Sequence, residues 1–147
     1  MNKKYIFLIA VLSLIFTTVF VWKKINPKND MLLRDRQRKD DLVIIQKGLA
    51  EYYKNNYSYP KSSVGRIVGC GGEACIWGYP WDDGNIRYLE KMPYDPLSSQ
   101  SYLYSYDEQT KSYTIEACLE NLKDRSGIKT DNTRWCKNGL VYKVGSR

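Results

Sequence analysis

The segment YIFLIAVLSLIFTTVFVW, residues Tyr5–Trp22, carries no charged side chain. A helix of this length rises about 27 Å, close to the roughly 30 Å hydrocarbon core of a bilayer. Lysine pairs at 3–4 and 23–24 flank it, as is typical of a membrane interface. A cleaved signal peptide would have a shorter apolar region and a small-x-small site, which residues 17–22 lack. The segment therefore predicts an uncleaved transmembrane helix, with residues 1–25 as the anchor and the lipid bilayer as its partner.

An amphipathic helical pattern follows the apolar segment, at about residues 30–56. Apolar side chains recur there at spacings of three and four, as on one face of a helix. Asn55-Asn56 and then Tyr59-Pro60 end the pattern. Such a face needs a covering layer, and a sheet from the same chain is the natural candidate. The residues expected to pack on that sheet are Leu42, Ile45, Leu49 and Tyr53.

The C-terminal part of the chain predicts an antiparallel sheet. Tyrosines alternate with smaller residues over 101–106, a turn follows, and apolar residues alternate again over 113–119. A third alternation at 140–144 predicts another strand.

Between helix and sheet, residues 61–97 are irregular and rich in glycine and proline. The aromatic side chains of this stretch, which include Trp77, Tyr79 and Trp81, are expected to pack the loop against itself. An aromatic sugar-binding platform formed by these residues is the alternative.

The four cysteines, Cys70, Cys75, Cys118 and Cys136, make an even count. The first two do not have the C-x2-C spacing of thioredoxin-like motifs or zinc ribbons. Because a small domain gains most from covalent links, two disulfide bonds in an oxidising compartment are predicted. Three pairings are consistent with the count, and we favour Cys70 with Cys75 and Cys118 with Cys136. A four-cysteine zinc site is the alternative.

The composition argues against an enzyme. The chain has no histidine, which removes the triads, zinc ligands and neutral-pH proton shuttles that use this residue. Much of its net charge of +7 lies at 23–39, but acidic residues interleave there, so nucleic acid is not an expected partner. Asp82, Asp83 and Asp95 are the alternative catalytic carboxylates, although their surroundings are typical of turns. No catalytic residue is predicted.

Three segments, in this order, resemble the type IV pilin and type II secretion pseudopilin superfamily, especially its major-pseudopilin-like members. Residues 34–60 end in Tyr59-Pro60, which is similar to the end of the family's helix. Residues 88–96 include Pro93-Tyr94-Asp95-Pro96, which resembles the family's Pro-x-Asp-Pro element before the sheet. Residues 102–121 resemble its first two strands.

The resemblance implies an α+β, pilin-like fold. One long N-terminal helix, with a transmembrane half and an amphipathic half, would pack on a small antiparallel sheet. The expected domains are the anchor, residues 1–25, and the pilin-like head, residues 26–147. The implied function is that of a membrane-anchored minor or accessory component of a type IV filament or of a type II secretion system for protein secretion. Its partners would be other pilin-like subunits or secretion-system proteins.

The N-terminus departs from the family pattern. Family members have a leader that is cut before a phenylalanine and a glutamate in the apolar segment. Here residues 3–9 contain no glycine for the cleavage position, and Tyr5–Trp22 contains no glutamate. The departure implies a non-standard subunit. It also keeps open a stand-alone membrane-anchored extracytoplasmic binding module with a pilin-like head.

The expected localisation is a single-pass inner-membrane protein with a cytoplasmic N-terminus. The positive-inside rule favours a cytoplasmic head, whereas the cysteines and the resemblance favour the periplasmic or extracellular head that we expect. The resemblance also suggests calcium near the C-terminal loop, at Asp124 and Asp131. No EF-hand-like spacing occurs there, so no cofactor is predicted.

Overall fold

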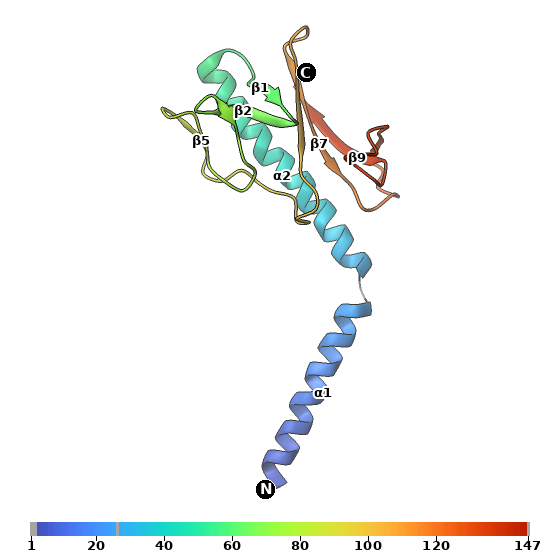
Figure 1. Ribbon diagram of the computed structural model, residues 1–147. Coiled ribbons are helices and arrows are strands. Elements are labelled where there is room, and N and C mark those ends of the chain that lie inside the picture. The colour runs from blue at the N-terminus through green and yellow to red at the C-terminus, as the bar shows by residue number, and fades with distance from the viewer. Residues whose placement is uncertain (1–2, 26, 147) are drawn as a thin grey trace. The chain divides into compact units, whose positions relative to one another are not determined.

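The computed structural model describes residues 3–25 and 27–146. The chain divides into two compact units, Met1–Leu33 and Arg34–Arg147. Within the described residues the helices are α1 (Lys3–Ile25) and α2 (Pro27–Asn56), as Figure 1 shows. Proline lacks a backbone N–H, which makes it well suited to the first position of a helix, and α2 begins at Pro27.

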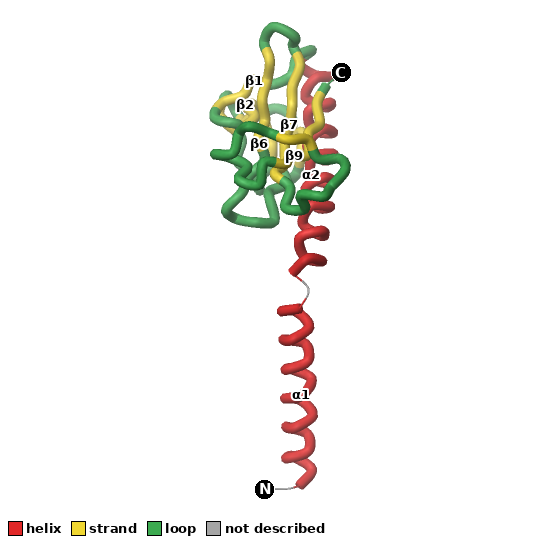
Figure 2. Tube along the Cα trace, turned by 90° about the vertical axis from the view of Figure 1, so that its right-hand side faces the viewer, coloured by secondary structure: helices red, strands yellow, loops and turns green. Residues whose placement is uncertain are grey.

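The strands form three small antiparallel sheets (Figures 1 and 2). The first contains β1 (Lys61–Ser63), β2 (Arg66–Cys70) and β3 (Glu73–Ala74). The second contains β4 (Trp81–Asp82) and β5 (Arg87–Leu89). The third has the order β6-β7-β9-β8, from β6 (Leu103–Asp107), β7 (Ser112–Cys118), β8 (Ile128–Lys129) and β9 (Leu140–Gly145).

Side-chain alternation sets the register of the third sheet. Along β7, Tyr113, Ile115 and Ala117 are buried, and Ile115 pairs with Tyr104 on one side and Val144 on the other. A shift by one residue would turn this apolar row to solvent. The strands predicted from alternation are confirmed as β6, β7 and β9.

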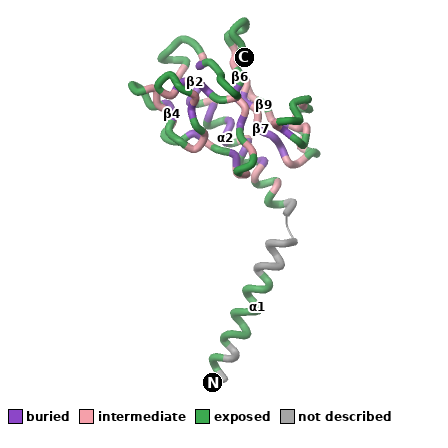
Figure 3. The backbone as a smooth tube through the Cα atoms, in the orientation of Figure 1, coloured by how far each residue is buried: buried purple, intermediate pink, exposed green. Residues whose placement is uncertain are grey.

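The core of the Arg34–Arg147 unit lies between α2 and the sheets, and Figure 3 marks its buried residues. Leu42, Ile45 and Leu49 of α2 are fully buried in one cluster with residues of β6 and β7. Ile67 of β2 and Trp81 of β4 belong to the same cluster. The smaller sheets therefore extend one continuous core.

The predicted fold class is wrong in its main feature. It required one long, partly transmembrane N-terminal helix packed on a sheet, but the described chain has two helices. The apolar face that enters the core belongs to the second of them, α2. The structure is a small α+β fold with antiparallel sheets.

The predicted membrane anchor is also contradicted. Within residues 3–25 and 27–146, no helix combines the length and the apolarity that crossing a bilayer requires. This finding overturns the transmembrane helix at Tyr5–Trp22 and the single-pass inner-membrane localisation.

Candidate functional site

A buried arginine joins α2 to two distant parts of the chain. Arg38 is fully buried. Its Nε and Nη2 donate to the two carboxylate oxygens of Asp95, at 2.8 and 2.9 Å. Its Nη1 donates at 2.7 Å to both Asp35 and Glu120. The guanidinium therefore has three carboxylate partners, which is the compensation that a buried charge needs.

The same carboxylates hold the end of β7 against α2. Asp35 accepts the backbone N–H groups of Glu120, at 3.0 Å, and Asn121, at 2.8 Å. Arg34 forms a two-bond pair with Glu120, at 2.7 and 2.6 Å. We call Arg34, Asp35, Arg38, Asp95 and Glu120 the arginine network.

The electrostatics of the arginine network favour the charged forms of Arg38 and Glu120. Burial lowers the pKa of Arg38, but its hydrogen bonds to Asp95 and Glu120 outweigh this effect and raise the pKa above its ordinary value. The hydrogen bond from Arg34, helped by Arg38, lowers the pKa of Glu120. Both shifts keep Arg38 and Glu120 charged near neutral pH, and the hydrogen bonds of the network position chain segments.

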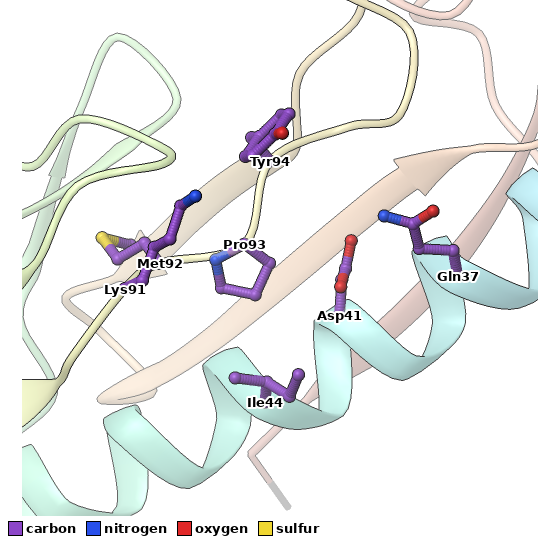
Figure 4. A pocket seen from close by; sticks show the side chains of 7 residues that line it. All are labelled: Gln37, Asp41, Ile44, Lys91, Met92, Pro93 and Tyr94. Carbon is purple, nitrogen blue, oxygen red and sulfur yellow. The ribbon is translucent and has the colours of Figure 1, made fainter.

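A small cavity of about 270 Å³ lies beside the network (Figure 4). Gln37, Asp41 and Ile44 of α2 form one wall, and residues 91–94 form the other. Asp41 accepts the hydroxyl of buried Tyr102 at 2.5 Å. Burial raises the pKa of Asp41. The cavity lies just under the ~300 Å³ lower limit of most small-molecule sites.

The alternative catalytic carboxylates are already engaged in structural roles. Asp82 accepts the N–H of Gly84 at 2.7 Å, and Asp83 accepts the N–H of Asn85 and the hydroxyl of Tyr88. Asp95 is bound by Arg38. The three side chains therefore do not converge on one reacting position.

The suggested calcium ligands do not form a cluster either. Asp124 accepts the Lys39 amine at 2.6 Å, which lowers the pKa of Asp124 to about 2, with a contribution from Ser126. Asp131 is exposed. Among the residues that the structure describes, no group of three or more acidic or cysteine side chains is arranged to hold a metal.

The cysteines form two disulfide bonds. Cys70 is joined to Cys75 and Cys118 to Cys136, with Cα–Cα distances of 5.2 and 5.3 Å. Both bonds lie within the described residues and together use all four thiols, which excludes the four-cysteine zinc site in this structure.

The predicted helix face is buried in part. Leu42, Ile45 and Leu49 are fully buried, but burial of Tyr53 is contradicted because its side chain is 44% exposed. Tyr53 lies in the last turn of α2, where its ring packs on Tyr59 at 4.8 Å between centroids.

The aromatic platform at 77–81 is not formed. Trp81 is fully buried and donates its indole N–H to the Gly69 carbonyl at 3.1 Å, while Trp77 packs on Tyr102. Of the three rings, only that of Tyr79 is exposed.

The sequence contains a signal for the arginine network that periodicity analysis missed. Asp35 and Arg38 precede Leu42, Ile45 and Leu49 at the same alternating spacings of three and four. Charged residues on the extension of an apolar stripe point toward the core and therefore need partners. That reasoning would identify the buried charges, although not Asp95 or Glu120 as their partners.

No protein-family model, curated protein or solved structure matches this chain.

Proposed function

We propose that this chain is a non-catalytic, pilin-like minor or accessory component of a type IV filament or type II secretion system. The observation that carries the proposal is the arginine network. Its residues come from all three segments that resemble the pilin superfamily: Arg34, Asp35 and Arg38 from 34–60, Asp95 from 88–96, and Glu120 from 102–121. Segments with a shared structural role would be expected to meet in this way.

The disulfide bonds favour a working location outside the reducing cytosol. Disulfides persist in oxidising compartments and are rare where glutathione and thioredoxin keep thiols reduced. Both bonds lie in the Arg34–Arg147 unit. That unit would therefore face the periplasm or the outside of the cell.

The first helix supplies the surface for assembly. Large apolar side chains of α1 are exposed to 40–74%, with Phe16 the most exposed. A contiguous apolar surface of this kind marks a contact site for a partner. In the proposed function, the partners are helices of neighbouring pilin-like subunits.

Site-specific photocrosslinking in the native cell tests the proposal. A benzophenone amino acid replaces Phe16 in one variant and Val64, which is 97% exposed in the other unit, in the control. We expect irradiation of the Phe16 variant to give covalent adducts with pilin-like or secretion-system subunits, and the Val64 variant to lack them. Adducts with lipid alone, or the same proteins from both positions, would contradict it.

A stand-alone extracytoplasmic binding module with a pilin-like head is the second candidate. The specific observation in its favour is the absence of glutamate from Tyr5–Trp22, since the family uses that side chain in assembly. This candidate predicts that Phe16 gives no adduct with any filament or secretion-system subunit, so the same experiment separates the two.

A further inference from the structure

A cleft rich in tyrosine lies between the C-terminal end of α2 and the turn that joins β6 to β7. Its volume is about 670 Å³, within the range of small-molecule sites. Four tyrosines line it, Tyr53, Tyr57, Tyr59 and Tyr106, together with serine and threonine hydroxyls and the side chain of Lys111. We call it the tyrosine cleft. All of its lining residues belong to the Arg34–Arg147 unit.

A ladder of rings fixes the aromatic wall of the cleft. Buried Tyr104 stacks on Tyr113 at 6.0 Å, Tyr113 meets Tyr59 edge-on at 4.6 Å, and Tyr59 packs on Tyr53 at 4.8 Å between centroids. The ladder runs from a fully buried ring to one that is 44% exposed. Since each ring is held by the one beneath it, little conformational freedom remains to be lost on binding.

The tyrosine hydroxyl groups of the core and those of the cleft differ in their hydrogen bonding. In the core, Tyr102 donates to Asp41 and Tyr104 donates to the Pro60 carbonyl. In the tyrosine cleft, by contrast, the phenol hydroxyls make no hydrogen bond to any residue in the described part of the chain. The cleft therefore presents several hydroxyls that are free to donate to or accept from a ligand.

The backbone beside the cleft adopts a conformation that side chains normally disfavour. Tyr57 follows the last residue of α2 with φ of 54°, and its N–H donates to the Tyr53 carbonyl at 2.8 Å. This left-handed position at a helix end is usually occupied by glycine. Lys111, on the opposite side of the cleft, has φ of 53°. Residues with strained backbone conformations cluster at functional sites. The side chain of Tyr57 is also accessible to a ligand, since the residue is 84% exposed.

We propose that the tyrosine cleft is a saccharide-binding site. A pyranose ring has apolar C–H faces that pack on tyrosine rings and hydroxyls that exchange hydrogen bonds with phenol, serine and threonine groups. Tyrosine and serine surfaces suit such ligands because they combine rigid amphipathic area with adaptable hydrogen bonding. The lining contains no carboxylate, and Lys111 adds a donor for a sugar hydroxyl or a uronate carboxylate.

The strands at the cleft argue against an extended peptide as the ligand. A peptide that adds to a sheet needs unpaired backbone groups at the strand edge. Here the Tyr113 N–H donates to Ser146 Oγ at 3.0 Å, and the Tyr113 carbonyl accepts the Ser146 N–H at 3.2 Å. The Tyr106 N–H donates to Ser62 Oγ at 3.2 Å.

Saturation-transfer NMR and calorimetry on the full oxidised chain test the site. The probes are cellotriose, which is neutral, and tri-galacturonate, which is acidic, each up to about 10 mM, a concentration that detects the weak end of specific binding. The test variant is Tyr57→Gly, which removes the ring and suits the left-handed backbone. The control is Tyr79→Gly, which removes an exposed ring outside the cleft.

We expect at least one probe to bind and Tyr57→Gly to weaken its binding about five- to tenfold, the typical effect of losing one aromatic contact. The melting temperature of Tyr57→Gly should equal or exceed that of the parent, so weaker binding would not reflect unfolding. Tyr79→Gly should bind like the parent.

Loss of uronate binding alone in Lys111→Gly would identify the acidic sugar as the ligand type. No binding of either probe, or equal binding by parent and Tyr57→Gly, would overturn the proposal, as would competition by a proline-rich peptide at lower concentration than either sugar.

Discussion

Replacing Arg38 with methionine keeps an unbranched side chain on α2 but removes the shared partner of two buried carboxylates. Asp35 and Asp95 are only 2% and 3% exposed, so both would remain as poorly compensated charges. Breaking a buried ion pair in this way typically costs about 3–5 kcal/mol. We expect Arg38→Met to lower the free energy of unfolding by that amount, measured by urea denaturation at pH 7. Arg36→Met, on the exposed face of α2, is the matched control. Equal midpoints for the two variants would contradict the role of the network.

Asp41 is a residue whose charge opposes folding. Burial raises its folded-state pKa above the ordinary 3.8, although the Tyr102 hydrogen bond acts in the opposite direction. Because the folded state holds the proton more tightly, Asp41 disfavours folding increasingly as pH rises from about 3.8 through the folded-state pKa. Asparagine keeps an acceptor for Tyr102 and has no charge to bury.

We therefore expect the melting temperature of Asp41→Asn, relative to the parent, to increase between pH 3 and pH 7. A difference that stays constant with pH would show that Asp41 has the same proton affinity folded and unfolded.

At the scale of the elements, α2 lies close to the second sheet at Gly48. Alanine is ordinarily favoured over glycine inside a helix by about 1 kcal/mol. At Gly48, however, an added Cβ would lie 2.8 Å from Leu89 Cγ and 3.0 Å from the Trp81 ring. We expect Gly48→Ala to destabilise the protein by about 1–3 kcal/mol in urea unfolding, because overpacking outweighs the propensity. Lys47→Ala, on the exposed face, should change the stability little. A more stable Gly48→Ala would mean that α2 can move away from β5.

The elements that sequence patterns identify are those with a complete period. The α2 stripe through Leu42, Ile45 and Leu49 and the strand alternation around Ile115 both repeat over enough residues to specify a buried face. Tyr53 continues the helical spacing, but its ring meets Tyr59 at the cleft, outside the fully buried core. The spacing of apolar residues along a helix does not show where the layer that covers the helix face ends.

Local sequence patterns do not identify most of the contacts that build the arginine network and the tyrosine cleft. Asp95 lies 57 residues from Arg38, and Glu120 lies 82 residues away. The tyrosine cleft likewise combines the end of α2 with the β6–β7 turn and Ser146. The strands of the first two sheets contain only two to five residues, too few for a reliable period.

At the scale of the whole molecule, the prediction of an N-terminal membrane anchor is contradicted. An uncharged run such as Tyr5–Trp22 establishes that no ion must be buried, but a spanning helix must meet length and apolarity together. No helix in residues 3–25 and 27–146 meets both requirements. The disulfide bonds and the arginine network instead concentrate the stabilising links in the Arg34–Arg147 unit.

The two disulfide bonds of that unit should contribute unequally. Their cysteines are separated by 18 positions for Cys118–Cys136 and by five for Cys70–Cys75. In the chain-entropy model, closing the longer loop contributes about 3 kcal/mol and the shorter about 2 kcal/mol. Location increases the difference: the longer loop contains Glu120, which binds Arg38. The shorter loop contains Gly71 and Gly72, whose surroundings are open.

We expect joint replacement of Cys118 and Cys136 by serine to lower the melting temperature more than joint replacement of Cys70 and Cys75. The measurement is thermal unfolding of the oxidised proteins, after peptide mapping has verified the remaining bond in each. Opening the longer loop should also release Glu120 from Arg38, so a later Arg38→Met substitution should cost less in that background than in the parent. Equal costs of Arg38→Met in the two backgrounds would show that the arginine network holds the loop without help from the disulfide.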